Sequence, residues 1–195
     1  MTVKKTSRFH PGVLAKSVIV FVIPFLTLTS KAEAPVQETS SEYKIKAVFL
    51  YNFSQFVEWP EKTFAEQGTP LVIGILGKDP FGYYLDETVY GENANDHPMI
   101  VKRFVSVKDV SSCHILFIKV GGKEDLTEIF DRLKSKSILT VGDTDDFIRK
   151  GGMVRFFTEK NKTRIQINLE AVEEAGLIIS SKLLGVAEIV SPQNK

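Results

Sequence analysis

Few side chains in this sequence have a type and spacing that could perform chemistry, and three of them are aspartates. Asp143, Asp145 and Asp146 follow an apolar segment, residues 137–141, that is typical of a buried strand. Acidic side chains at the carboxyl ends of parallel strands can bind Mg²⁺, and α/β folds place ligands at such ends. Asp145 or Asp146 is equally well explained as the cap of a short helix that runs to Arg149. We favour this second, purely structural explanation.

The histidines and the glycine-rich loop offer no stronger candidate site. His97 lies in a polar turn and His114 begins an apolar segment, and the sequence contains neither HExxH nor a Cys/His cluster. The segment 77–82 (GKDPFG) follows a predicted strand, as a phosphate-binding loop would, but it lacks the GxGxxG spacing and the GK[ST] ending. We therefore expect no metal, no cofactor and no catalytic residues, which argues against an enzyme.

Cys113 is the one cysteine of the chain, so it can form no internal disulfide. Because it begins an apolar segment, we expect it to be a buried, unreactive thiol. An intermolecular disulfide in an oxidising compartment is the alternative.

Trp59 is the one tryptophan, and it stands between Glu58 and Pro60 at the end of a predicted aromatic helix. Phe53 and Phe56, on the same helix, are expected in the core. A tryptophan at the end of an element can also anchor a binding partner. For Trp59 both interpretations stay open.

The elements that must position these residues begin with a helix over 42–57. Ser40 or Ser41 is expected to be its N-cap, and it ends before Pro60. Its apolar residues recur at helical spacing and are unusually aromatic: they are Ile45, Phe49, Phe53 and Phe56.

Strands and helices then alternate along the chain. Apolar runs predict strands at 71–76, 98–105, 114–120 and 137–141, with helices at 81–88 and 123–133. The last third predicts a β-hairpin, 153–159 and 163–169, introduced by Gly151 and Gly152, and closing helices at 171–175 and 181–189. The expected fold class is therefore α/β: a single domain with a largely parallel sheet, helices on its faces, a C-terminal hairpin and closing helices.

The N-terminal segment has the layout of a secretory signal. Lys4, Lys5, Arg8 and Lys16 precede an apolar run at 18–26 that Pro24 interrupts. A membrane anchor is the alternative, but a spanning helix needs about 20 consecutive apolar residues. We expect a cleaved signal peptide (1–32), a linker (33–41), the domain (42–190), a short tail (191–195) and a periplasmic location.

Removal of residues 1–32 changes the charge of the chain. The full sequence has 25 basic and 24 acidic residues, and five of the basic ones lie in the predicted signal peptide. The remaining 20 basic and 24 acidic residues give the mature chain a net charge of −4. Nucleic-acid recognition starts from a basic patch, so this charge excludes nucleic acid as the expected partner.

Several stretches, taken together, resemble a known family. In order, they are KAVFLYNFSQFVEWP (46–60), ILGKDPFG (75–82), CHILFI (113–118), LTVGD (139–143), GGM (151–153), RIQIN (164–168) and the segment 175–184 with AGL and SKLL. This ordered set, over residues 43–190, resembles the YfiR family of periplasmic proteins. No single piece is decisive, but FVEWP after an aromatic helix is fairly specific.

The resemblance implies a regulatory role. The best-understood relative binds the periplasmic sensor domain of an inner-membrane diguanylate cyclase and holds it inactive, which lowers cyclic di-GMP and biofilm formation until envelope or redox stress releases it. Other relatives are associated with histidine kinases or outer-membrane receptors, and relatives tend to be dimers. We expect partner-binding surfaces at the end of the first helix and around the GGM motif, at Phe56, Glu58, Trp59, Gly151, Gly152, Met153 and Arg155.

One position departs from the redox-responsive relatives. In them, a cysteine of the first strand pairs with the cysteine of the "CH" strand, which corresponds to Cys113, but here Gly74 stands at the first position. The resemblance therefore implies that another trigger than an internal disulfide acts in this chain.

Two other functions remain as hypotheses. The first is a periplasmic small-molecule carrier or sensor, with its pocket at the strand ends near Gly77 and Asp143. The second is an envelope enzyme that uses Asp143 and Asp146, and it has the least support.

Overall fold

The computed structural model describes residues 36–121 and 125–191, so the predicted signal peptide lies outside the described residues. Among the described residues, no helix combines the length and the apolar character needed to cross a membrane. The described residues belong to one unit of the chain, 34–195.

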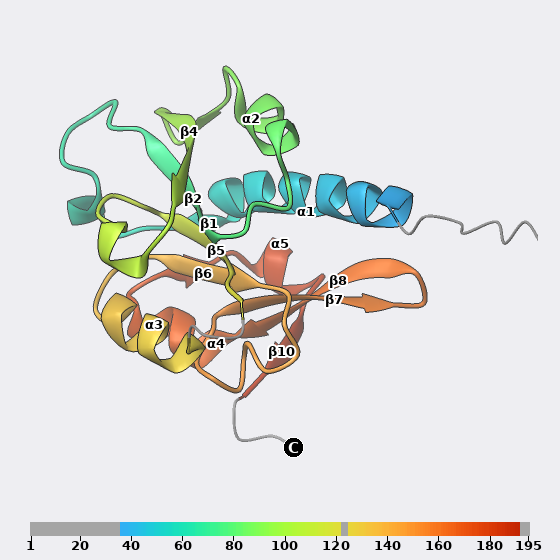
Figure 1. The fold of residues 1–195 in the computed structure, drawn as a ribbon. Helices are drawn as coiled ribbons and strands as arrows, with labels where there is room; N and C mark the ends of the chain where they lie inside the picture. The colour runs from blue at the N-terminus through green and yellow to red at the C-terminus, as the bar shows by residue number, and fades with distance from the viewer. Residues whose placement is uncertain (1–35, 122–124, 192–195) are drawn as a thin grey trace, which may run out of the picture. The chain divides into compact units, whose positions relative to one another are not determined.

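An eight-stranded sheet forms the centre of this unit, in the order β10-β8-β7-β6-β5-β2-β4-β3 (Figure 1). The neighbours from β4 to β7 in this order are parallel, while β7–β8 and β3–β4 are antiparallel. The predicted largely parallel sheet and the predicted hairpin are thus confirmed. The strands are β2 (Leu71–Gly77), β3 (Asn93–Ala94), β4 (His97–Phe104), β5 (Ile115–Lys119), β6 (Leu139–Gly142), β7 (Val154–Glu159), β8 (Lys162–Asn168) and β10 (Glu188–Val190).

Helices cover both faces of the sheet. One core contains buried residues of α1, α2, α4 and α5, and the core on the opposite face contains those of α3. The helices are α1 (Val36–Phe56), α2 (Tyr83–Val89), α3 (Leu126–Leu133), α4 (Leu169–Glu174) and α5 (Ser181–Leu184), with 3-10 turns η1 (Glu61–Thr63) and η2 (Val107–Asp109). A two-stranded sheet joins β1 (Val57–Glu58) to β9 (Ile178–Ile179).

The position of β2 in the centre of the sheet explains why its sequence is apolar without alternation. Leu71, Ile73 and Ile75 belong to the core under α1, while Val72 and Leu76 belong to the core under α3. A strand that is covered on both faces needs apolar side chains at every position.

The start of the first helix differs from the prediction. α1 begins at Val36, within the segment predicted as a linker, so Ser40 and Ser41 lie inside the helix and the predicted N-cap is wrong. Residues 36–41 (VQETSS) have moderate helix propensity and include neither Gly nor Pro, so the helix extends through them.

The buried face of α1 is also turned relative to the predicted one. Ala47, Leu50 and Phe53 are completely buried, whereas Ile45, assigned to the apolar face, is 47% exposed. Lys46 is turned inward and is only 3% exposed. A buried lysine requires a charged or hydrogen-bonding partner, and Asp143 supplies it.

Four side chains, which we call the ion cluster, connect α1 to the ends of β5 and β6. Lys46 Nζ lies 2.8 Å from Asp143 Oδ2, and Lys119 Nζ lies 2.9 Å from Asp143 Oδ1. Tyr43 donates its hydroxyl hydrogen to Asp143 Oδ2 at 2.7 Å and accepts a hydrogen bond from Lys119 Nζ at 2.6 Å. Every member of the ion cluster therefore contacts at least one other.

The protonation of the ion cluster follows from these contacts. Burial alone would raise the pKa of Asp143, but the hydrogen bonds from Lys46, Tyr43 and Lys119 outweigh burial and hold that pKa below its usual range. Burial and the hydrogen bond to Asp143 raise the pKa of Tyr43. Asp143 is thus a carboxylate, and Tyr43 keeps its hydroxyl hydrogen, at neutral pH.

One predicted helix is shorter than expected and another is absent. The expected helix 181–189 ends at Leu184, and Glu188–Val190 forms β10, parallel to β8. Residues 145–150 form successive turns instead of a short helix that Asp145 or Asp146 would cap.

The turns at 145–150 have a packing cause. Phe147 is fully buried and lies against Gly142 and Gly152, where added Cβ atoms would be 2.3 Å and 2.2 Å from its ring. Gly151 has a positive φ of 109°. The pair Gly151–Gly152 therefore supplies the positive φ that we predicted and also the space for Phe147.

We predict that Asp143→Asn destabilises the protein by about 3 kcal/mol, because it removes the counter-charge of Lys119 and one of the two counter-charges of the buried Lys46, whose other partner is Glu42 Oε1 at 2.6 Å. Urea unfolding at neutral pH measures this change. Asp145→Asn is the matched control, since the Asp145 side chain is 99% exposed and the same substitution there should cost about 0.5 kcal/mol or less. Equal effects of the two substitutions would show that the ion cluster does not stabilise the fold.

Candidate functional site

Of the seven residues predicted to bind a partner, four lie at two concave places on the same edge of the sheet. Phe56 is instead half-buried against the core, and Gly152 is buried against Phe147. Glu58 and Trp59 line a hollow beside the start of β2, and Gly151 and Met153 line a cavity beside the start of β7. Both places are at the amino-terminal ends of parallel strands. Arg155 differs: it pairs with Gly142, the last residue of β6, and thus lies toward the carboxyl-terminal edge.

The first place, which we call the acidic hollow, has a volume of about 600 Å³. Trp59 and Phe64 contribute aromatic rings, and no Lys or Arg lines it. Its carboxylates, those of Glu58, Glu61, Glu66 and Asp96, form no ion pair or side-chain hydrogen bond with any described residue. The hollow is therefore an aromatic surface with uncompensated negative charge.

A stack of rings forms the wall between the acidic hollow and the sheet. Phe64 lies between His97, at 3.8 Å between ring centroids, and His114, at 4.6 Å. Trp59 meets the ring of His114 edge-on at 6.1 Å. Trp59 is half-buried, so it is both a packing residue and part of the surface, and its role as an anchor for a partner stays a prediction.

Sequence reasoning missed this stack and the role of Phe64 in it. His97 and His114 are far apart in the sequence, but β4 and β5 flank β2 and bring His97, the first residue of β4, and His114, just before β5, to the same edge. Only the parallel order of these strands could have signalled their proximity.

His114 is held as a neutral imidazole by its hydrogen bond. Its Nδ1 accepts from the backbone N–H of Val72 at 3.0 Å, so the hydrogen of the neutral ring is on Nε2, which is buried with no partner among the described residues. Burial, together with electrostatic repulsion from His97 and Lys102, lowers the pKa of His114 to about 4. A proton on Nδ1 would face the Val72 N–H and break this bond.

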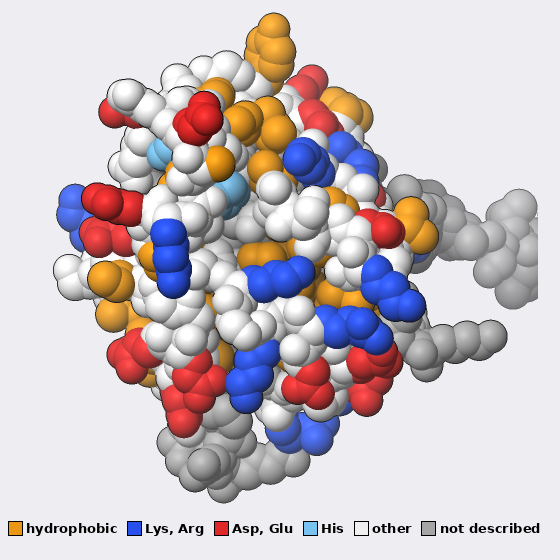
Figure 2. Space-filling view, turned by 90° about the vertical axis from the view of Figure 1, so that its left-hand side faces the viewer, with side chains coloured by type: hydrophobic (Ala, Val, Ile, Leu, Met, Phe, Trp, Pro, Cys, Tyr) orange, Lys and Arg blue, Asp and Glu red, His pale blue; other side chains and the backbone are white. Residues whose placement is uncertain are grey.

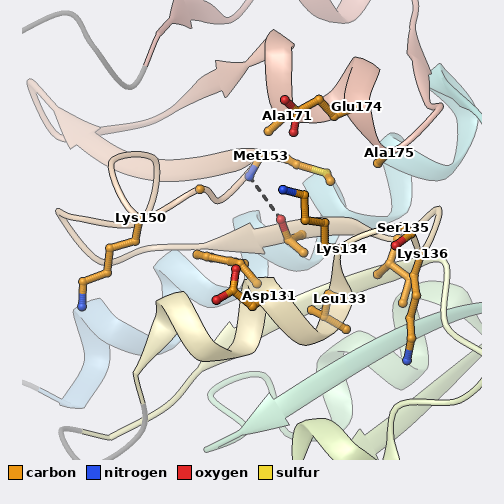
Figure 3. A pocket seen from close by; sticks show the side chains of 14 residues that line it. Asp131, Leu133, Lys134, Ser135, Lys136, Lys150, Met153, Ala171, Glu174 and Ala175 are labelled. Atoms are coloured by element: carbon orange, nitrogen blue, oxygen red, sulfur yellow. Dashed lines mark hydrogen bonds between the residues drawn. The ribbon is translucent and has the colours of Figure 1, made fainter.

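The second place is a cavity of about 410 Å³ between α3, the start of β7 and α4 (Figure 3). Met153 lies at its centre, and the Met153 N–H donates to Thr140 Oγ1 at 3.1 Å. Leu133 and Ala175 supply apolar walls, and the side chain of Lys134 reaches over the cavity. The predicted GGM surface is thus a concave, largely apolar site.

The opposite, carboxyl-terminal edge is where a ligand pocket was expected, and the ion cluster occupies it. A hollow of about 420 Å³ is lined by Tyr43, Lys46, Lys119 and Asp143, with Arg155 beside them. Gly77 does not line it; an added Cβ there would lie 2.5 Å from the backbone oxygen of Lys119, so the glycine allows two chain segments to approach. Among the described residues, no three His, Cys, Asp or Glu side chains are placed to hold a metal ion.

The comparison with family models shows to which protein family the chain belongs. Residues 43–188 match the family described as YfiR/HmsC-like. The chain belongs to this family. The members of the YfiR/HmsC-like family are regulators rather than enzymes and act through partner proteins.

Two further comparisons add little. The search of curated proteins found no match. Among solved structures, one match is the ABC domain in complex with L-Trp from Streptococcus pneumonia, with 10% identity and a TM-score of 0.44. The match covers 72% of this chain and spans 59% of that domain.

The cysteine position that sets this YfiR/HmsC-like chain apart can be examined directly. Cys113 is 5% exposed, so the predicted burial is confirmed, and burial raises the pKa of its thiol to about 12, which favours the unreactive thiol form. A Cβ added at Gly74 would lie 2.7 Å from Cys113 Sγ. The two positions that the resemblance connects therefore face each other across β2 and β5.

We predict that the stability of the protein falls as the pH is lowered from about 6.5 to about 4, by roughly 3 kcal/mol from His114 alone. The folded-state pKa is below the unfolded one, so the unfolded chain takes up the proton first. The contribution is complete above pH 6.5 and lost below pH 4. His114→Asn keeps an acceptor for the Val72 N–H without titrating; comparable pH slopes of the two unfolding curves would refute this role.

We also predict that Gly74→Cys forms an internal disulfide with Cys113 under oxidising conditions, once Phe104 and Leu116 shift to make room. Thiol titration without reductant should find no free thiol, and reduction should restore both. Gly121→Cys is the control, because an added Cβ there meets nothing within 4 Å and should leave both thiols free. Free thiols in the oxidised Gly74→Cys variant would contradict the facing arrangement.

Proposed function

We propose that the chain is a periplasmic regulatory protein that binds the periplasmic domain of an inner-membrane signalling enzyme and represses it, with a diguanylate cyclase as the target. The observation that carries the proposal is the match to the YfiR/HmsC-like family over residues 43–188. The apolar run that begins at Val18, preceded by basic residues, supports export.

The geometry supports binding rather than catalysis. His114, the most perturbed histidine, is committed to a backbone hydrogen bond, and the carboxylate oxygens of Asp143 are occupied by Lys46, Lys119 and Tyr43. The amino-terminal edge, in contrast, offers two concave sites with free side chains. We assign the partner to this edge.

Repression needs a difference in affinity between two states of the enzyme. A protein that bound the active and the inactive state equally would shift nothing, however tightly it bound. A change from 1% to 99% inactive enzyme needs about 10⁴-fold tighter binding to the inactive state. The partner surface must therefore recognise a conformation of the periplasmic domain, not only its presence.

Deletion of the gene should raise cyclic di-GMP, and expression of the full chain should lower it again. Affinity-tagged chain should recover a membrane cyclase from detergent extracts. Expression of the chain without residues 1–32 is the matched control, since it stays in the cytoplasm and should not complement the deletion. Unchanged cyclic di-GMP after deletion, together with no cyclase in the extract, would overturn the proposal.

A further inference from the structure

The acidic hollow holds four carboxylates in one concave place, and their charge determines what can occupy it. Its carboxylates have no cationic partner among the described residues, whereas Asp79, Asp86, Asp143 and Asp145 are each paired with Lys or Arg. Figure 2 looks onto this edge and shows acidic side chains near the pale-blue histidines, while Lys and Arg are spread over the middle, the lower part and the margins of the face. The hollow therefore attracts a cation and repels an anion.

The aromatic rings restrict the kind of cation. Trp59 and Phe64 line the hollow, but His97 and His114 cover the two faces of the Phe64 ring. An organic cation can therefore stack only on Trp59, where the ring quadrupole stabilises it. A metal ion is disfavoured, because no three acidic, His or Cys side chains among the described residues are arranged to ligate one. A guanidinium or ammonium group on a flexible stem fits both the spread carboxylates and the Trp59 ring.

A second observation at Trp59 points to a chain rather than a free amine. The indole Nε1 of Trp59 is buried and has no acceptor among the described residues. A buried donor without an acceptor is an unfavourable arrangement, and a small rotation of the ring would present it to a carbonyl oxygen. A peptide segment brings a backbone carbonyl together with its basic side chain.

We propose that the acidic hollow receives an Arg or Lys side chain from the protein partner, with the aliphatic stem on Trp59 and the charged group between Glu58, Glu61, Glu66 and Asp96. This inference rests on the proposed function and identifies the chemistry of the partner segment. The hollow's volume of about 600 Å³ is large enough for such a side chain together with adjoining backbone.

Trp59 reports on this site because it is the only tryptophan in the chain. Titration of the purified mature chain with Nα-acetylarginine amide should give a saturable change in tryptophan fluorescence that weakens with salt. Nα-acetylcitrulline amide, which has nearly the same shape without the charge, should give none. No saturable change with the arginine probe, an equal change with the citrulline probe, or a response to Ca²⁺ or Mg²⁺ alone would overturn the inference.

Charge removal tests the site in the folded protein. The triple variant Glu58→Gln, Glu61→Gln, Glu66→Gln should bind the arginine probe roughly tenfold more weakly. The control Glu159→Gln, Glu170→Gln, Glu173→Gln removes the same charge from exposed positions elsewhere and should bind like the wild type. All six side chains are exposed, so neither variant is expected to unfold.

Repression in cells separates this inference from the proposed function. If wild type lowers cyclic di-GMP and the triple variant at the hollow does not, both stand. If the triple variant represses as well as wild type, the acidic hollow is not the contact and the inference fails while the function stands. If wild type itself has no effect, the proposed function fails, and the arginine titration then tests the hollow alone.

Discussion

The interaction on which the rest of the structure depends is the burial of Asp143 between two lysines and a tyrosine. It fixes the rotation of α1, because Lys46 can reach Asp143 only from the inward face of the helix. That rotation places Ala47, Leu50 and Phe53 in the core and turns Ile45 outward. Apolar side chains can pack in several rotations of a helix, because their contacts have no fixed direction. A buried ion pair is stable only when its two charged groups meet at hydrogen-bonding distance. The ion cluster thus sets the register between the first helix and the carboxyl-terminal edge of the sheet.

The ion cluster also gives the two edges of the sheet different roles, because it occupies the carboxyl-terminal edge. In open α/β sheets the carboxyl edge is the usual ligand site. Here its central side chains, Asp143 and Lys119, already bond to each other. The amino-terminal edge has loops at 59–70 and 134–138 instead, and their side chains leave concave sites. The surface with free side chains is therefore opposite to the one that fold topology alone would favour.

Elements that depend on local signals could be predicted from the sequence. β2 is an uninterrupted apolar run, and the β7–β8 hairpin combines alternation with a turn at Lys160 and Asn161, both of positive φ. β10 could not be predicted, since its strand conformation comes from pairing with the edge of β8, more than twenty residues earlier in the chain. The turns at 145–150 could not be predicted either, because they depend on a tertiary contact: Phe147 is buried between two glycines.

The residues of the candidate site also divide into those with a local sequence signal and those that only the fold brings together. Trp59 and Glu58 were recognised because a lone tryptophan beside charged residues is visible in the sequence. Asp96, Phe64 and the histidine stack were not, because only the order β5-β2-β4 brings them to Trp59. Arg155 was grouped with the GGM motif by proximity in sequence, although β7 carries it to the level of Gly142, the last residue of β6.

The pairing of β1 with β9 has a consequence for the order in which the chain folds. Val57, at the end of the first helix, pairs with Ile179 near the other end of the domain, so the first element is completed by one of the last. Contacts between such distant segments form slowly, because closing the long loop between them costs entropy before the contacts can stabilise the structure. A chain threaded through an export channel in the direction of synthesis cannot complete this pairing until nearly all of it has crossed. The arrangement delays the native state to the compartment where the protein is proposed to act.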